Sequence, residues 1–156
     1  MIEMKRYLPL ALALLAAASC EMVDMPVYDT SFVYIATAAG ADNATIGSDV
    51  DNVNTYYVYL SSGPLAEALT VDFSVTAGAG LTEGVDYEMV TQGGQVSFLP
   101  GIYRVPLRIR WKPREVDPAA DNTLVVRLTG NSGGFVLGFP GPDATFSALT
   151  LKKMNL

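Results

Sequence analysis

The chain has 156 residues, half of them hydrophobic and 17% charged, so it is long enough for one domain with a real core and too apolar for a disordered polymer. It has no histidine and one cysteine, which excludes an internal disulfide, a Cys/His zinc cluster and the usual hydrolytic triads. A formal net charge of −6 argues against nucleic acid as a partner, because phosphate binding requires clustered cations on a basic domain.

The first nineteen residues follow the pattern of a signal peptide. Lys5 and Arg6 precede an apolar run at 8–18, which is shorter than the roughly 20 residues that cross a bilayer. Small residues then lead to Cys20. This arrangement resembles the lipobox of bacterial lipoproteins, although Ala17 stands where leucine is usual. The resemblance implies a signal peptide at 1–19 and an acylated Cys20; an ordinary secretory peptide cut after Ala18 is the alternative.

Residues 20–29 are expected to form a lipidated tether between the membrane and the domain. Glu21 and Asp24 are similar to the acidic export signals of Bacteroidetes surface lipoproteins, and a solvated linker is the alternative. We therefore expect a lipid-anchored protein of the cell envelope, at the outer membrane rather than the inner one. The sequence leaves open which face of that membrane it occupies.

Residues 30–156 carry the pattern of an all-β domain. The loop predicted at 38–54 is polar and rich in Gly, Asp and Asn. Turn residues recur about every 8–12 positions, which is typical of a sandwich. We predict an immunoglobulin-like β-sandwich of seven to eight strands, with strands at 31–37, 55–61, 69–77, 85–90, 95–99, 102–111, 123–129 and 144–153.

The strand predicted at 102–111 has one apolar and one basic side. Pro106 lies on its polar side and cannot donate a ladder hydrogen bond, which predicts an edge position or a bulge. The cations there protect an edge from aggregation or bind anionic sugars or lipid headgroups, and we prefer the first interpretation. We call these residues the basic row: Arg104, Arg108, Arg110, Lys112 and Arg114.

Two tyrosines are the candidate ligand contacts. In the strand at 55–61, Tyr56 and Val58 share one face, so Tyr57 and Tyr59 share the other. Paired outward rings can stack on sugar rings, since they combine an apolar face with a polar rim. Cross-strand packing or cover by a loop is the alternative, and we prefer it because strands are enriched in tyrosine.

The segment from about 70 to 130 resembles the Calx-beta type of immunoglobulin-like domain. Two motifs carry the resemblance: a Gly-x-Asp-Tyr turn (Gly84, Asp86, Tyr87) and a Val-x-Phe-x-Pro-Gly corner that begins at Val96 and ends at Gly101. The pattern also looks like the N-terminal immunoglobulin-like domains of Bacteroidetes lipoproteins of unassigned function. Many of those are encoded with polysaccharide-uptake systems, which implies a link to glycan capture.

Calcium is the cofactor that the Calx-beta resemblance raises. Its calcium-binding members carry adjacent acids after the long strand, whereas Glu115, Asp117 and Asp121 are spaced apart here. Asp86 adds one carboxylate at most, and hard cations take six or more oxygens. Asp86 is better suited to capping backbone N–H groups of its own turn. We therefore expect no cofactor, with a calcium site at these four acids as the alternative.

Three functions fit these features. The first is a non-enzymatic envelope lipoprotein whose single domain binds a protein or a glycan. The second is a structural subunit of a surface or fimbria-like assembly that uses strand addition at a sheet edge. The third is a small glycosidase, because two carboxylates suffice for that chemistry and Glu83 and Glu88 are available. We prefer the first, since the acids lie mostly in loops without an apolar setting.

Overall fold

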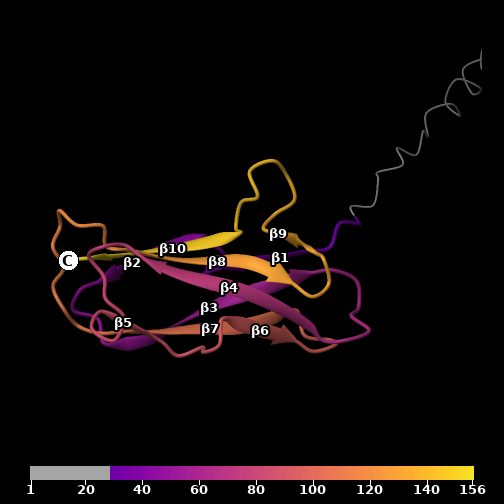
Figure 1. The fold of residues 1–156 in the computed structure, drawn as a ribbon, viewed down its shortest axis with the longest axis horizontal. Coiled ribbons are helices and arrows are strands. Elements are labelled where there is room, and N and C mark those ends of the chain that lie inside the picture. The colour runs from indigo at the N-terminus through magenta and orange to yellow at the C-terminus, as the bar shows by residue number, and fades with distance from the viewer. Residues whose placement is uncertain (1–28) are drawn as a thin grey trace, which may run out of the picture.

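The computed structural model describes residues 29–156, which form a sandwich of two five-stranded sheets (Figure 1). The signal peptide and Cys20 lie outside the described residues. Sheet A has the order β5-β7-β3-β1-β9 and sheet B the order β2-β10-β8-β4-β6. The ten strands are β1 (Phe32–Ala36), β2 (Asn43–Gly47), β3 (Asn52–Ser61), β4 (Leu69–Ala77), β5 (Tyr87–Met89), β6 (Gln95–Phe98), β7 (Arg104–Trp111), β8 (Thr123–Asn131), β9 (Val136–Leu137) and β10 (Ala148–Met154).

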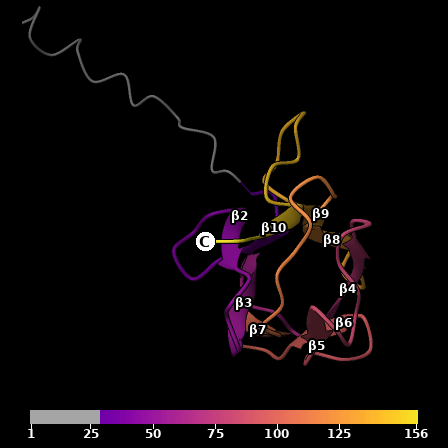
Figure 2. The same ribbon diagram turned by 90° about the vertical axis from the view of Figure 1, so that its left-hand side faces the viewer.

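The core lies between the two sheets and is built by the period-two alternation of the strands. Seen from the end in Figure 2, the strands surround one common interior. Sheet A contributes Val58 and Trp111, and sheet B contributes Val126 and Leu151, all fully buried. Each such side chain contributes about 1.5–3 kcal/mol by leaving water. Among residues 29–156 no helix is both long and apolar enough to cross a membrane.

All eight predicted strands are present, and the structure adds two that the sequence did not predict. β2 lies inside the loop predicted at 38–54, and β9 follows Phe135. Both are edge strands with a parallel partner: β2 pairs with β10, and β9 pairs with β1. The prediction of seven to eight strands was therefore too low. Short edge strands are held mainly by backbone hydrogen bonds, so their side chains need not alternate between apolar and polar residues. The sequence therefore gave no pattern by which β2 and β9 could be predicted.

The strand β7 is the second strand of sheet A, between β5 and β3. Its partner β5 reaches only the end of β7, opposite Ile109 to Trp111. Pro106 is the partner of Tyr57 on β3. In an antiparallel ladder hydrogen-bonded pairs alternate with non-hydrogen-bonded pairs, and the Leu60 N–H to Tyr103 carbonyl bond makes Leu60–Tyr103 a hydrogen-bonded pair. Tyr57–Pro106, three positions along, is therefore a non-hydrogen-bonded pair, and the proline nitrogen points away from β3. The edge position predicted for Pro106 is therefore confirmed for that half of the strand.

The corner before β7, at the Pro-Gly of the Val-x-Phe-x-Pro-Gly motif, is a type II turn. The Ile102 N–H donates to the Leu99 carbonyl at 2.9 Å, which places Pro100 and Gly101 at the two central positions. Gly101 has φ +86°, the positive value that this turn requires at its second central residue.

Candidate functional site

Aromatic side chains gather on the outer, solvent-facing side of sheet A. The antiparallel pairing of β1 and β3 puts Tyr34 directly opposite Tyr59. Their rings stack with centroids 4.9 Å apart and planes 11° from parallel. Tyr57 lies two residues along the same face, with its ring centroid 5.9 Å from that of Tyr59. The six rings of this surface, which we call the aromatic face, are Phe32, Tyr34, Tyr57, Tyr59, Phe139 and Phe146.

The loop 138–147, between β9 and β10, supplies two of these rings. It projects from the body of the sandwich in Figures 1 and 2. Phe139 and Phe146 stack on each other with centroids 4.6 Å apart, and Phe139 meets the Tyr34 ring at 4.9 Å. The Ile35 N–H donates to the Phe146 carbonyl at 2.9 Å, which holds the loop to the edge of β1.

The loop backbone is strained where it returns to the sheet. Ala144 has φ +42° and Phe146 has φ +61°, a region that costs non-glycine residues about 1–2 kcal/mol each. Packing of the Phe146 ring against Tyr34 and Phe139 offsets this cost. The two phenylalanines of the loop thus extend the tyrosine surface.

An arginine completes the aromatic face at the β7 side. The Arg104 guanidinium carbon lies 4.4 Å from the centre of the Tyr57 ring, a cation–π contact. Register places Arg104 opposite Tyr59, and Arg108 opposite Thr55. The aromatic face and the basic row are thus neighbouring parts of one sheet surface.

Burial affects the titration of one ring in this surface. Desolvation raises the pKa of the Tyr34 phenol, and the neighbouring Tyr59 raises it further. The cause is that two phenolates cannot form side by side without repulsion. At neutral pH the Tyr34 hydroxyl therefore remains a hydrogen-bond donor.

The structure places Tyr57 and Tyr59 on the outer face of β3, both half-buried, and brings them together with residues that the sequence did not single out. It also shows one feature of the alternative, the cross-strand stacking of Tyr59 on Tyr34, while the loop packs on Tyr34. Tyr34 was detectable, because it alternates with the buried Val33 and Ile35. Phe139 comes directly before a Pro-Gly-Pro corner, which gave no sign of its place on the sheet. Phe146 lay in the strand predicted at 144–153, but β10 begins only at Ala148, so that start was wrong and Phe146 belongs to the loop. Contact of Tyr57 and Tyr59 with a ligand remains a prediction.

Asp86, one of the four acids considered for calcium, is fully buried beside a lysine that is also fully buried. The Lys153 Nζ lies 3.3 Å from Asp86 Oδ1 and donates to the Lys112 carbonyl at 2.8 Å. We call Asp86 and Lys153 the buried pair. The Arg114 Nε is 3.4 Å from the same oxygen, and the Thr82 N–H donates to Asp86 Oδ2 at 2.8 Å. Asp86 therefore caps its own turn, as expected, and anchors β10 to it.

The other three acids are exposed and do not join Asp86. Asp117 Oδ1 accepts from the Ala119 N–H, and Asp121 Oδ1 accepts from the Thr123 N–H and hydroxyl. No hydrogen bond or ion pair is seen for Glu115 among the described residues. Within residues 29–156 no three acids, cysteines or histidines lie close enough to hold a metal ion.

The two glutamates considered for glycoside hydrolysis lie on the exposed turn around β5. Glu88 forms an ion pair with Lys112, with Nζ 3.2 Å from Oε2. Glu83 lies outside the strands, and its backbone forms an isolated β-bridge with Tyr87. Both are exposed, so neither lies in the apolar surroundings that are typical of a glycosidase's general acid.

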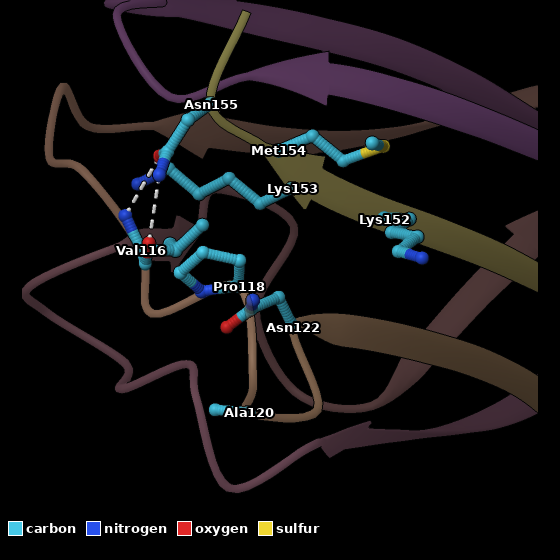
Figure 3. A pocket seen from close by; sticks show the side chains of 8 residues that line it. All are labelled: Val116, Pro118, Ala120, Asn122, Lys152, Lys153, Met154 and Asn155. Atoms are coloured by element: carbon cyan, nitrogen blue, oxygen red, sulfur yellow. Dashed lines mark hydrogen bonds between the residues drawn. The ribbon is translucent and has the colours of Figure 1, made fainter.

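A pocket of about 250 Å³ opens at the end of β10 that carries the C-terminus (Figure 3). The Val116 N–H donates to Asn155 Oδ1 at 2.9 Å, and the Asn155 Nδ2 donates to the Val116 carbonyl at 2.8 Å. Asn122 lines the pocket, and its Oδ1 has no partner among the described residues. That oxygen packs against Gly80, where an added Cβ would come within 1.9 Å of it. No carboxylate is among the residues that line this pocket.

Comparison with known proteins identifies the fold and nothing finer. No family model matches the chain, and no curated protein matches it. A solved structure described as the calcium binding domain CBD12 of CALX1.1 matches with a TM-score of 0.55 and 17% identity. The match covers 80% of this chain and 44% of that one, so the chain spans under half the length of its structural neighbour. The domain is a Calx-beta-like β-sandwich.

Proposed function

We propose that this protein is a non-enzymatic, lipid-anchored binding module of the bacterial cell envelope that holds a glycan on its aromatic face. One observation carries the proposal: the six rings gather on the solvent-facing side of a sheet, outside the core. A small sandwich that already has a full core between its sheets gains less from a second apolar cluster, which favours a binding role for these rings.

The chemistry of these rings suits a sugar. A pyranose presents a flat C–H face that packs against an aromatic ring, and its hydroxyl groups need hydrogen-bond partners at the ring's rim. Tyr57 and Tyr59 provide both, and each is partly exposed to solvent. Tyr34 supports Tyr59 from the neighbouring strand, so the surface is formed before a ligand arrives.

The proposed location in the cell envelope rests on the N-terminal sequence pattern. An acylated Cys20 would hold the domain at the outer membrane through the tether at 20–29, with more than one chain needed for firm anchoring. Palmitate labelling of cells that express the full chain tests this, with Cys20→Ala as the control. Labelling that persists in the Cys20→Ala variant would contradict a lipid anchor at this residue.

The edges of the sandwich favour this function over the structural alternative. In the described part of the chain the outermost strands are β5, β9, β2 and β6, with 3, 2, 5 and 4 residues. Strand addition depends on a long unpaired edge for its main-chain hydrogen bonds. An assembled fibre in native envelope extracts, in place of a monomer, would support the structural role instead.

The decisive experiment is a glycan array probed with the full chain in detergent, followed by calorimetry on each hit. We expect Tyr57→Ala with Tyr59→Ala to weaken binding at least about tenfold, since each stacked ring contributes about 0.5–1.5 kcal/mol. Ser74→Ala with Thr76→Ala, on the exposed side of β4 in sheet B, is the matched control and should bind normally.

Three results would count against the proposal. Blank arrays, together with pulldowns from envelope extracts that recover a protein partner, would replace the glycan with that partner. Equal loss in the Ser74→Ala, Thr76→Ala control would show that the aromatic face is not the site. Turnover of a glycan that is lost in Glu83→Gln or Glu88→Gln would make the protein an enzyme.

A further inference from the structure

The basic row is unusual in a chain that is otherwise acidic. Without residues 1–19 the chain loses Glu3, Lys5 and Arg6, which leaves eight basic and fifteen acidic residues. Five of the eight cations belong to the basic row on or just after β7. Positive charge is thus concentrated on one surface, and that surface adjoins the aromatic face.

The basic row divides into a paired half and an open half. Arg110 pairs with Asp51 at 3.2 Å, and Lys112 pairs with Glu88 at the same distance. Arg114 reaches the buried Asp86. At the other end of β7, beside the tyrosines, Arg104 and Arg108 are exposed and form no ion pair with any residue between 29 and 156.

The open half lies where a ligand on the tyrosines would extend. Arg104 is opposite Tyr59 and rests on the Tyr57 ring, and Arg108 is four residues further along the same side of β7. A cation–π contact engages the face of the guanidinium and leaves N–H donors for another group. A guanidinium binds carboxylate and sulfate groups with two parallel hydrogen bonds, which suits an anion on a sugar ring.

We propose that the glycan held by the aromatic face is acidic, with uronate or sulfate groups that are bound by Arg104 and Arg108. This inference rests on the proposed function and specifies its ligand. The sugar ring stacks on Tyr57 and Tyr59 while its anionic substituent faces β7. Because the rest of the chain is acidic, the two arginines also direct an anionic polymer to this side of the molecule.

The test compares acidic with neutral polysaccharides on the full chain in detergent. The probes are polygalacturonate and chondroitin sulfate against galactan and xylan. We expect the acidic probes to bind more tightly, and high NaCl to weaken only them. Arg108→Gln should weaken the acidic probes several-fold and leave the neutral ones unchanged, and adding Arg104→Gln should raise the loss on the acidic probes to about tenfold or more. Arg127→Gln, an exposed cation of sheet B, is the matched control.

Each other outcome rejects the inference. Equal affinity for neutral and acidic probes would leave the proposed function standing and remove the acidic specificity. No binding of any polysaccharide would remove both. Equal losses on neutral and acidic probes in the double arginine variant would mean that the arginines only support the tyrosines. Tighter binding of a single-stranded oligonucleotide, with the same arginine dependence, would make the ligand a nucleic acid.

Discussion

The aromatic face lies on sheet A beside the start of β7, whereas the buried pair lies near the end of β7 and joins the turn before β5 to β10 of sheet B. Each brings together segments that are far apart in the sequence. Register places Tyr59 beside Arg104 at one end, and Trp111 beside Tyr87, which follows Asp86, at the other. The exposed end combines rings and an arginine with open N–H donors, whereas the buried end has its charges enclosed and paired. Polar groups that still have bonding capacity are suited to a ligand, and polar groups that are fully paired stabilise the fold.

This difference predicts that variants at the two ends change different properties. A substitution in the buried pair should change the free energy of unfolding and leave the glycan affinity of the folded protein alone. A substitution on the aromatic face should lower the glycan affinity and change the free energy of unfolding by less than a substitution in the buried pair does. Sheet B provides controls for both, because its exposed side carries mostly small hydroxyl side chains such as Ser74 and Thr76.

The largest effect is expected from Asp86→Ala. It leaves Lys153 charged, fully buried and without its carboxylate, so the free energy of unfolding should fall by about 3–5 kcal/mol. Urea denaturation followed by tryptophan fluorescence measures this change, since Trp111 is the only tryptophan and is fully buried. Adding Lys153→Met should restore part of the loss. A cost below about 1 kcal/mol for Asp86→Ala would mean that the Lys112 carbonyl and water are sufficient partners for the Lys153 ammonium.

The next effect concerns the loop 138–147. Phe139→Ala with Phe146→Ala removes two partly exposed rings, so the free energy of unfolding should fall by about 1–3 kcal/mol, less than for fully buried phenylalanines. If these rings extend the site, glycan affinity measured by calorimetry falls as well. If the loop instead covers the tyrosines, the same variant binds more tightly. That second result would restore the interpretation of Tyr57 and Tyr59 as covered packing residues.

A smaller effect on stability is expected from Arg104→Gln. The guanidinium is exposed and makes one cation–π contact, so the free energy of unfolding should change by less than about 1 kcal/mol. The same urea titration measures it, and Lys153→Met serves as the contrasting loss of a buried cation. A drop of several kcal/mol in Arg104→Gln would assign this arginine to the fold.

The smallest effect is expected at alkaline pH. Burial raises the pKa of the Tyr34, Tyr56 and Tyr87 phenols above the usual 10.0, with Tyr59 also acting on Tyr34. A phenol whose pKa is raised by folding stabilises the folded protein at pH values below 10. That stabilisation is lost as the pH rises through the pKa of the folded state. In an alkaline titration followed by tyrosinate absorbance, a late fraction of the tyrosines should therefore ionise at a higher pH than the rest. Tyr34→Phe should shrink that fraction, and an unchanged late fraction would contradict the assignment to Tyr34.

Much of the fold could be predicted because strand alternation is a local property. The eight predicted strands, the turn at Pro100-Gly101 and the cap by Asp86 all follow from residues within a few positions of one another. The outward side of Tyr57 and Tyr59 followed in the same way. For Lys153 the alternation with Leu149 and Leu151 was present in the sequence, and a buried lysine requires an acidic partner.

The sequence by itself determined the strands, their inner faces and the turns between them. Only the tertiary structure decided the parallel edges β2 and β9, the loop that adds Phe139 and Phe146 to the aromatic face, and the choice of Asp86 as partner for Lys153. The physical reason is that these contacts join positions far apart in the chain. Their formation depends on how the two sheets pack together, and the sequence of a short segment does not predict that packing.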